Sequence, residues 1–395
     1  MLSKTLPLLL ALVLAGCNSF SRSTPKPTVP LEPPIPAVGN VSLHTATQLP
    51  AEHELLEIGI VVFDLPAQLA GQTRPGESLY REIAEKEAQY LPYVLRNTLV
   101  ESNQWGPVRV LPEADPSVDL NLAGTILSST GLTLELQVKV TDSTGRLWLD
   151  KTYRDVTTDQ DYPGRDPFLR SFASEEELAD NLITDTDPFA DIYRQIANDL
   201  LAMRNTMEPA ELENVSLVSQ MLYAAELSEA TFGRTLERGE DGLLRVTSLL
   251  ARDDPMLQRV ETIKLRHHLF IDTVDEYYES LYQQMQPSYA LWRRYSRDEA
   301  IEDKTQEQRT SSRADPESGS FLALSQSYNR YKWAKLFEQE FMALAAGFNN
   351  EVAPAILELN RRVHGLSGTL EEQYRQWREI LRQIFELESG DQVSR

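Results

Sequence analysis

The side chains best suited to acid–base or metal chemistry are five histidines, one cysteine and 60 carboxylates. Two of the histidines, His267 and His268, are adjacent in the sequence. Neighbouring side chains on a helix point about 100° apart, so this pair is poorly placed to chelate one ion, unlike residues at i and i+4. His364 is followed by Gly365 and is interpreted as a cation near a helix end. The histidines therefore predict no metal site.

Two acidic clusters have part of the spacing of a calcium-binding loop. In the first, Asp159 and Asp161 occupy ligand positions, but Pro163 is at the fifth position and Arg170 at the twelfth. Calcium loops need an oxygen ligand at the fifth position and a bidentate glutamate at the twelfth. The second cluster, at residues 185–191, lacks the glycine and the closing glutamate. We interpret both clusters as surface carboxylates or helix caps.

The usual enzyme motifs are missing from the sequence. It contains no glycine-rich phosphate loop, no Gly-x-Ser-x-Gly elbow and no His-Glu-x-x-His pair, so we predict no cofactor and name no catalytic residue. A glycosidase needs only two carboxylates, and spacing cannot select two from 60 acids. A cell-wall-modifying enzyme therefore stays open as an alternative. The net charge of −22 argues against nucleic acid as a partner, because phosphate backbones require clustered Lys and Arg.

Aromatic and basic residues interleave in residues 289–297, where Trp292, Arg293, Arg294 and Tyr295 are consecutive. Such side chains stack on sugars or pair with the acidic groups of a glycan or a partner. The alternative interpretation is a helix whose aromatic face is internal and whose basic face is solvated. We name these four as candidate residues for glycan or partner contact.

The elements that must position any site begin with an α+β pattern. Residues 57–63 form a β-branched apolar run typical of a buried strand, and Leu132–Val140 alternates apolar with polar residues. Asp142–Gly145 is typical of a hairpin turn. These patterns predict an α+β domain, a mixed sheet with packed helices. The expected strands are 57–63, 108–112, 118–128, 132–140 and 146–156, and the expected helices are 77–103, with a kink or restart at Pro92, and 173–205.

Beyond Pro209 the strand signals stop and helical periodicity continues, which predicts an all-α helical bundle. A polar stretch near residues 297–320 has no large apolar residue apart from Ile301, so we expect a mobile loop there. The helical signals are at 211–236, at 255–286 with Pro287 as the breaker, in a Trp333–Ala345 stripe, and at 374–385.

The N-terminus combines one lysine, a short apolar run and the sequence Leu14-Ala15-Gly16-Cys17. It resembles the lipobox of bacterial lipoproteins. The resemblance implies cleavage after residue 16, acylation of Cys17, and outer-membrane sorting because Asn18 rather than aspartate follows. Two or more acyl chains give stable anchoring. The expected division is a signal peptide at 1–16, the lipidated cysteine and a proline-rich tether at 17–52, the α+β domain at 53–207 and the helical bundle at 208–395.

A second resemblance rests on the leading strand after the tether, on Asp119–Ile126 and on the hairpin Val140–Trp148. Residues 55–205 resemble the domain shared by the N-terminal part of TolB, curli-secretion lipoproteins and lipoprotein activators of penicillin-binding proteins. This resemblance implies a periplasmic interaction domain rather than a catalyst.

Together these observations predict a lipid-anchored outer-membrane lipoprotein that faces the periplasm. It would act as a non-catalytic accessory or scaffold in an envelope assembly, secretion or cell-wall machine, with the acidic body selecting basic partner surfaces. Its expected partners are the membrane, through the lipid, an envelope protein and peptidoglycan. The alternatives are a peptidoglycan- or polysaccharide-modifying enzyme with a carboxylate site between the domains, and a lipid or glycan carrier.

Overall fold

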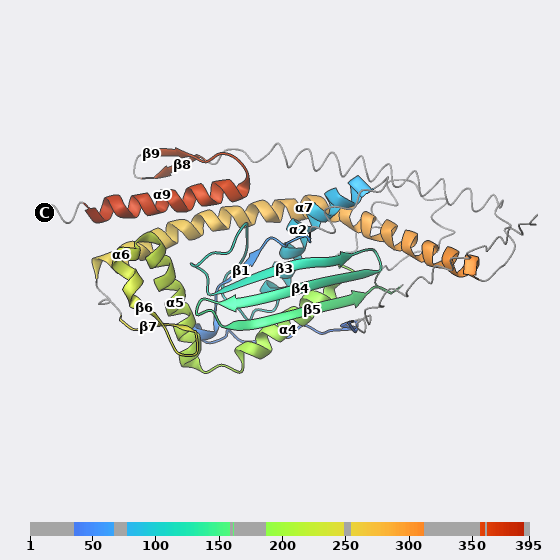
Figure 1. The fold of residues 1–395 in the computed structure, drawn as a ribbon, viewed down its shortest axis with the longest axis horizontal. Helices are drawn as coiled ribbons and strands as arrows, with labels where there is room; N and C mark the ends of the chain where they lie inside the picture. The colour runs from blue at the N-terminus through green and yellow to red at the C-terminus, as the bar shows by residue number, and fades with distance from the viewer. Residues whose placement is uncertain are drawn as a thin grey trace, which may run out of the picture. The chain divides into compact units, whose positions relative to one another are not determined.

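A mixed five-stranded sheet lies at the centre of the described fold (Figure 1). The computed structural model describes residues 35–66, 77–158, 161, 187–248, 254–311, 356–359 and 362–390. Residues 1–34, which include the lipobox-like sequence and the first half of the tether, and the Trp333–Ala345 stripe lie outside the described residues. The strands run in the order β2-β1-β3-β4-β5: β1 (Ile58–Val61), β2 (Val108–Leu111), β3 (Leu120–Ser129), β4 (Thr133–Asp142) and β5 (Leu147–Val156).

Strand β1 pairs in parallel with both β2 and β3, whereas β3, β4 and β5 form an antiparallel meander. Alternation along β4 decides which face is internal: Leu134, Leu136, Val138 and Val140 are all buried. The helices α2 (Glu77–Glu101) and α4 (Ala190–Arg204) contact the sheet. The predicted mixed sheet with packed helices is confirmed.

The second half is predominantly helical, as predicted. Its α-helices are α5 (Pro209–Leu227), α6 (Glu229–Phe232), α7 (Pro255–Ser311) and α9 (Leu370–Gly390). Helix α5 begins where the sequence dictates, with Pro209 in the first turn and the Glu211 side chain accepting from the Glu208 N–H. Two hairpins that the periodicity did not predict interrupt the helices: β6 (Leu236–Arg238) with β7 (Leu244–Val246), and β8 (Ile356–Leu359) with β9 (Arg362–Gly365). A 3-10 helix, η4 (Gly233–Thr235), lies just before β6, and another, η1 (Glu52–Glu54), precedes β1 in the first half of the chain.

Helix α7 is longer than predicted. It continues past Pro287, where we expected a break, and residues 297–311 are helical, so the prediction of a mobile loop is wrong over that part. Residues 312–320 lie outside the described residues. A proline within a helix costs about 3 kcal/mol because one hydrogen bond is lost and the ring meets a carbonyl. Burial of the Tyr289 and Trp292 rings just after the proline offsets this cost.

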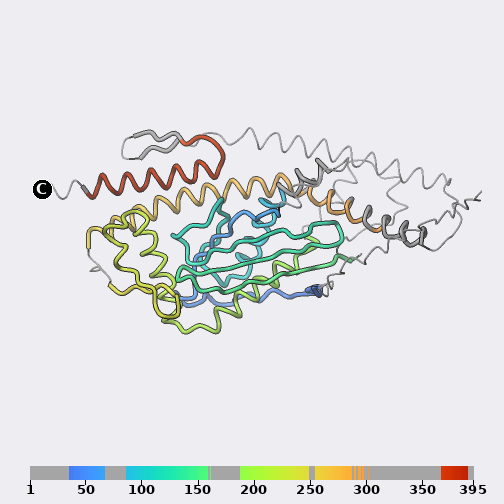
Figure 2. Tube along the Cα trace, in the orientation of Figure 1, coloured from blue at the N-terminus to red at the C-terminus, as the bar shows by residue number. Residues whose placement is uncertain are grey.

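One hydrophobic core includes residues from both predicted domains. Helix α7 lies against β2 and α2, and α9 lies alongside α7 (Figure 2). The carboxylate of Asp275 on α7 accepts a 2.8 Å hydrogen bond from the Val110 N–H, a donor on the sheet's edge strand. The helical half therefore covers a sheet edge, a place where unpaired backbone groups are otherwise exposed. Within the described ranges, no helix is long and apolar enough to cross a membrane.

The last part of the predicted tether is attached to this fold. The Val38 N–H donates to the Arg154 carbonyl on β5 at 2.9 Å. Asn198 on α4 accepts from the His44 N–H and donates to the Ser42 carbonyl, each at 2.9 Å. Residues 38–46 are thus held against the α+β elements by hydrogen bonds.

Candidate binding cleft

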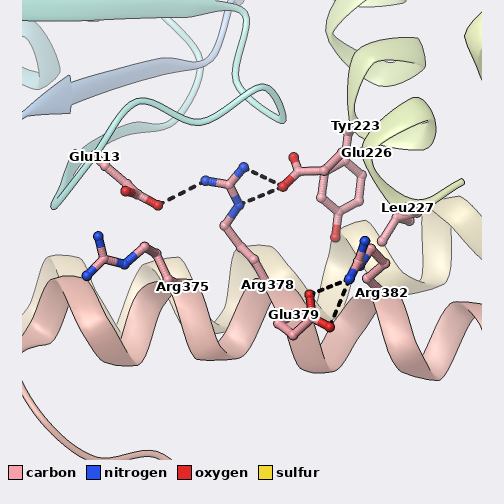
Figure 3. Close-up of a pocket in the computed structure, with 8 residues that line it drawn as sticks. All are labelled: Glu113, Tyr223, Glu226, Leu227, Arg375, Arg378, Glu379 and Arg382. Carbon is pink, nitrogen blue, oxygen red and sulfur yellow. Dashed lines mark hydrogen bonds and ion pairs between the residues drawn. The ribbon is translucent and has the colours of Figure 1, made fainter. Parts of the chain in front are cut away.

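A polar cleft of about 370 Å³ lies between α5, α9 and the β2–β3 loop, residues 112–119 (Figure 3). Most of its lining is charged, with three arginines and three glutamates, so its formal charges cancel. The lining residues are Glu113, Tyr223, Glu226, Leu227, Arg375, Arg378, Glu379 and Arg382.

Helix α9 presents the three arginines in one row. Its first turn is capped by Thr369: the Thr369 hydroxyl accepts a hydrogen bond from the Glu372 N–H, and the Thr369 N–H donates one to the Glu372 carboxylate. Residues i, i+3 and i+7 share a helix face, so Arg375, Arg378 and Arg382 point to the same side. The apolar stripe of the same helix, Tyr374, Trp377, Leu381, Ile384 and Phe385, is buried.

Arg378 joins the walls of the cleft. Its Nε donates to Glu226 Oε1 at 2.8 Å, its Nη2 also contacts that oxygen, and its Nη1 donates to Glu113 Oε1 at 3.0 Å. Burial by itself would lower the pKa of Arg378, but the carboxylates of Glu226 and Asp115 raise it above its ordinary value. Two cleft carboxylates therefore share one permanently charged guanidinium.

The other two arginines are less constrained. Arg382 pairs with Glu379 one turn away at 2.8 Å, and both side chains are about half exposed. Such solvent-exposed pairs contribute little to stability. Arg375 is exposed and has no ion-pair partner among the described residues. The cleft thus holds one available cation and a second that is weakly held.

Two polar atoms of the cleft lining lack hydrogen-bond partners within the described part of the chain. The Tyr223 hydroxyl is one, on a side chain that is only 2 % exposed and that extends from α5 toward α9 (Figure 3). Burial raises the pKa of Tyr223 well above its ordinary value, so the hydroxyl stays neutral and able to donate. Glu226 Oε2 is the other. A buried polar atom left unpaired costs about 1–3 kcal/mol, so each is a candidate for ligand contact.

A buried network lies beneath the cleft. Asp115 accepts a 2.6 Å hydrogen bond from the Tyr374 hydroxyl and a 2.7 Å bond from the Ser117 N–H, and its Oδ2 is 2.9 Å from His267 Nε2. The His267 ring stacks on Tyr223, with 5.4 Å between the ring centroids. Burial would raise the pKa of Asp115, but the charge and hydrogen bond of His267, with the other donors, hold it well below its usual range. Because His267 is fully enclosed, it fixes α7 to the loop and cannot reach a ligand.

The second histidine points to a different partner. His268 Nε2 lies 3.3 Å from Ser117 Oγ. Burial, followed by the positive charges of Lys264 and Arg109, lowers the pKa of His268 to about 3, so its ring is neutral at pH 7. No group of three potential metal ligands occurs among the residues that the structure places.

Two of the four candidate contact residues of α7 are buried. Arg293 is 0 % exposed and Trp292 is 3 % exposed. The Arg293 guanidinium donates to the Thr130 carbonyl and to the Tyr289 hydroxyl, each at 2.7 Å, and lies 3.1 Å from Glu87 Oε1. These two side chains are therefore internal, and the guanidinium satisfies acceptors on the β3–β4 turn, on α2 and on α7 itself.

The remaining candidate residues are Arg294, Tyr295, Cys17 and the two calcium-like clusters. Arg294 is partly buried, and the side chain of Tyr295 lies outside the described residues, as does Cys17. Of the calcium-like clusters, Asp161 accepts from the Thr158 N–H and Asp187 from the Phe189 N–H. These bonds are local turns and caps, in line with our interpretation.

Our sequence reasoning did not identify the cleft residues. The only signal was the arginine spacing on α9, which also occurs on any solvated helix face. The other elements contribute Tyr223, Glu226 and Glu113, and no local sequence pattern marks these residues as part of a site. The cleft depends on packing between segments more than 100 residues apart in the chain.

No family model matches the chain, and no curated protein matches it. Among solved structures, a DUF330 protein from Xanthomonas campestris is similar, with 11 % identity over 42 % of this chain and 89 % of its own, and a TM-score of 0.20. These values are too low to support an inference about fold or function.

Proposed function

We propose that this protein is a lipid-anchored outer-membrane lipoprotein, facing the periplasm, that acts as a non-catalytic accessory or scaffold in an envelope assembly, secretion or cell-wall machine. The anchor is the acylated Cys17 at the end of Leu14-Ala15-Gly16-Cys17. The partners are the membrane, through the lipid, and an envelope protein, with peptidoglycan as a further contact.

The observation that carries the proposal is the pairing of Glu113 and Glu226 with one arginine. A carboxylate enzyme needs a general acid whose proton is retained near neutral pH. Glu113 and Glu226 are instead both engaged by Arg378, the charge-assisted hydrogen bonding of an ion-pair network. The described cleft is therefore equipped for polar recognition, and this favours a binding role over the enzyme alternative.

The test is crosslinking in cells followed by affinity purification and mass spectrometry. The full chain is compared with Cys17→Ala, which leaves the folded residues unchanged. We expect wild type in the outer-membrane fraction with one or two envelope proteins in fixed ratio, and Cys17→Ala released from the membrane. Unchanged membrane association of Cys17→Ala would refute the anchor. Recovery of glycan fragments alone would refute the scaffold and favour the enzyme or carrier.

A further inference from the structure

We infer that the cleft between α5 and α9 binds an acidic peptide segment of the partner, with Arg375 as the primary cation. This inference rests on the proposed function, because it assumes that the partner is a protein. It adds the chemistry of the contact: a carboxylate side chain at the arginine row, and peptide backbone groups at the buried wall of the cleft.

The two less constrained arginines of the cleft, Arg375 and Arg382, favour a carboxylate ligand. Arg378 is already paired with Glu113 and Glu226, but Arg375 has no ion-pair partner among the described residues. Arg382 becomes available when its exposed pair with Glu379 opens, at little cost. A guanidinium binds a carboxylate through two parallel hydrogen bonds, a stronger contact than a neutral hydrogen bond.

The unpartnered atoms favour a peptide over a simple anion. The cleft wall offers one donor, the Tyr223 hydroxyl, and one acceptor, Glu226 Oε2. A peptide carries both complements in its backbone, a C=O for Tyr223 and an N–H for Glu226. Inorganic phosphate supplies negatively charged acceptor oxygens that Glu226 would repel. At about 370 Å³, the cleft accommodates a short stretch of chain rather than a folded surface.

The test measures binding of a fluorescent acetyl-Glu-Glu-Glu-amide peptide to the full chain by anisotropy, with acetyl-Gln-Gln-Gln-amide and inorganic phosphate as competitors. Arg375→Gln removes the free cation. Its matched control is Arg245→Gln, which removes the same charge from an exposed arginine that pairs with Asp241 outside the cleft. Tyr223→Phe removes only the hydroxyl.

We expect saturable binding that Arg375→Gln weakens about tenfold or more, as for loss of a charge-assisted hydrogen-bonded pair. Arg245→Gln should change affinity less than about twofold, because the Arg245 pair is exposed and remote from the cleft. Tyr223→Phe should weaken binding about threefold while the free protein unfolds at the same or higher urea concentration, since it loses an unpaired buried group. Weaker peptide binding without loss of stability in urea distinguishes a ligand contact from a structural role.

Absence of saturable binding, an equal loss in Arg375→Gln and Arg245→Gln, or equal displacement by phosphate or by the glutamine peptide would overturn the inference. Failure of the proposed scaffold function can be distinguished from failure of this peptide-binding inference. If crosslinking recovers an envelope protein whose capture is unchanged in Arg375→Gln, the scaffold stands and this inference falls. If the peptide binds as expected and crosslinking recovers no protein, the scaffold falls while the cleft chemistry stands.

Discussion

Replacing Asp115 with alanine tests whether the buried network beneath the cleft holds the helical half against the sheet. The Asp115 carboxylate is enclosed and is contacted from three segments, by His267 on α7, Tyr374 on α9 and the Ser117 N–H of its own loop. Truncation removes one acceptor group and leaves these donors without partners. No other described side chain joins α7, α9 and the β2–β3 loop in this way.

The size of the expected stability loss follows from the burial of the Asp115 carboxylate. Removing one member of a buried, hydrogen-bonded charged pair costs about 3–5 kcal/mol. Each donor left unsatisfied costs about 1–3 kcal/mol, and these values overlap rather than add. We therefore expect Asp115→Ala to lower the free energy of unfolding by about 4 kcal/mol at pH 7, a large part of the 5–15 kcal/mol that such folds possess.

The assay is equilibrium urea unfolding followed by circular dichroism, with Asp241→Ala as the matched control. That change also removes one negative charge, but from an exposed side chain, and should leave the free energy of unfolding almost unchanged. Because the folded-state pKa of Asp115 is held below its ordinary value, its stabilising effect is present above about pH 4 and is lost as the pH falls further. The difference between wild type and Asp115→Ala should therefore narrow in acid. A loss under about 1 kcal/mol at pH 7 would refute this reasoning.

Three further changes test other parts of the structure. Gly131→Ala would place a Cβ 1.9 Å from the backbone nitrogen of Arg297, so α7 should be cleaved faster in limited proteolysis, and an unchanged rate would count against the tight contact. Burial raises the pKa of Asp155 to about 6, so stability should fall as pH rises from about 4 to 6, and Asp155→Asn should remove this slope in urea titrations at several pH values. For His268, burial and then Lys264 lower the pKa to about 3, so the wild type should lose stability as pH falls from about 6.5 to 3. His268→Gln should reduce that loss, and an identical pH profile would contradict the assignment.

Local patterns were sufficient for the elements whose burial repeats with a fixed period. The alternation in β4 predicted the buried face of its strand, and the apolar stripe from Tyr374 to Phe385 predicted α9. The helix predicted to start at residue 255 does begin there, as α7, because the missing N–H of Pro255 is unneeded in a first turn. The lipobox predicts acylation of Cys17 from four residues alone. In each case the information lies within a few neighbouring side chains.

Tertiary packing decided the rest. Pro287 and the polar residues after it predict the end of a helix, yet α7 continues to Ser311, with the rings of Tyr289 and Trp292 buried just after the proline. Arg293 was expected at the surface and instead satisfies acceptors from two distant segments. The cleft is the clearest case, since Arg378 meets Glu113 and Glu226 from elements 265 and 152 residues away in the chain. Periodicity determines that a face is apolar or charged, but only the three-dimensional fold determines which other surface meets it.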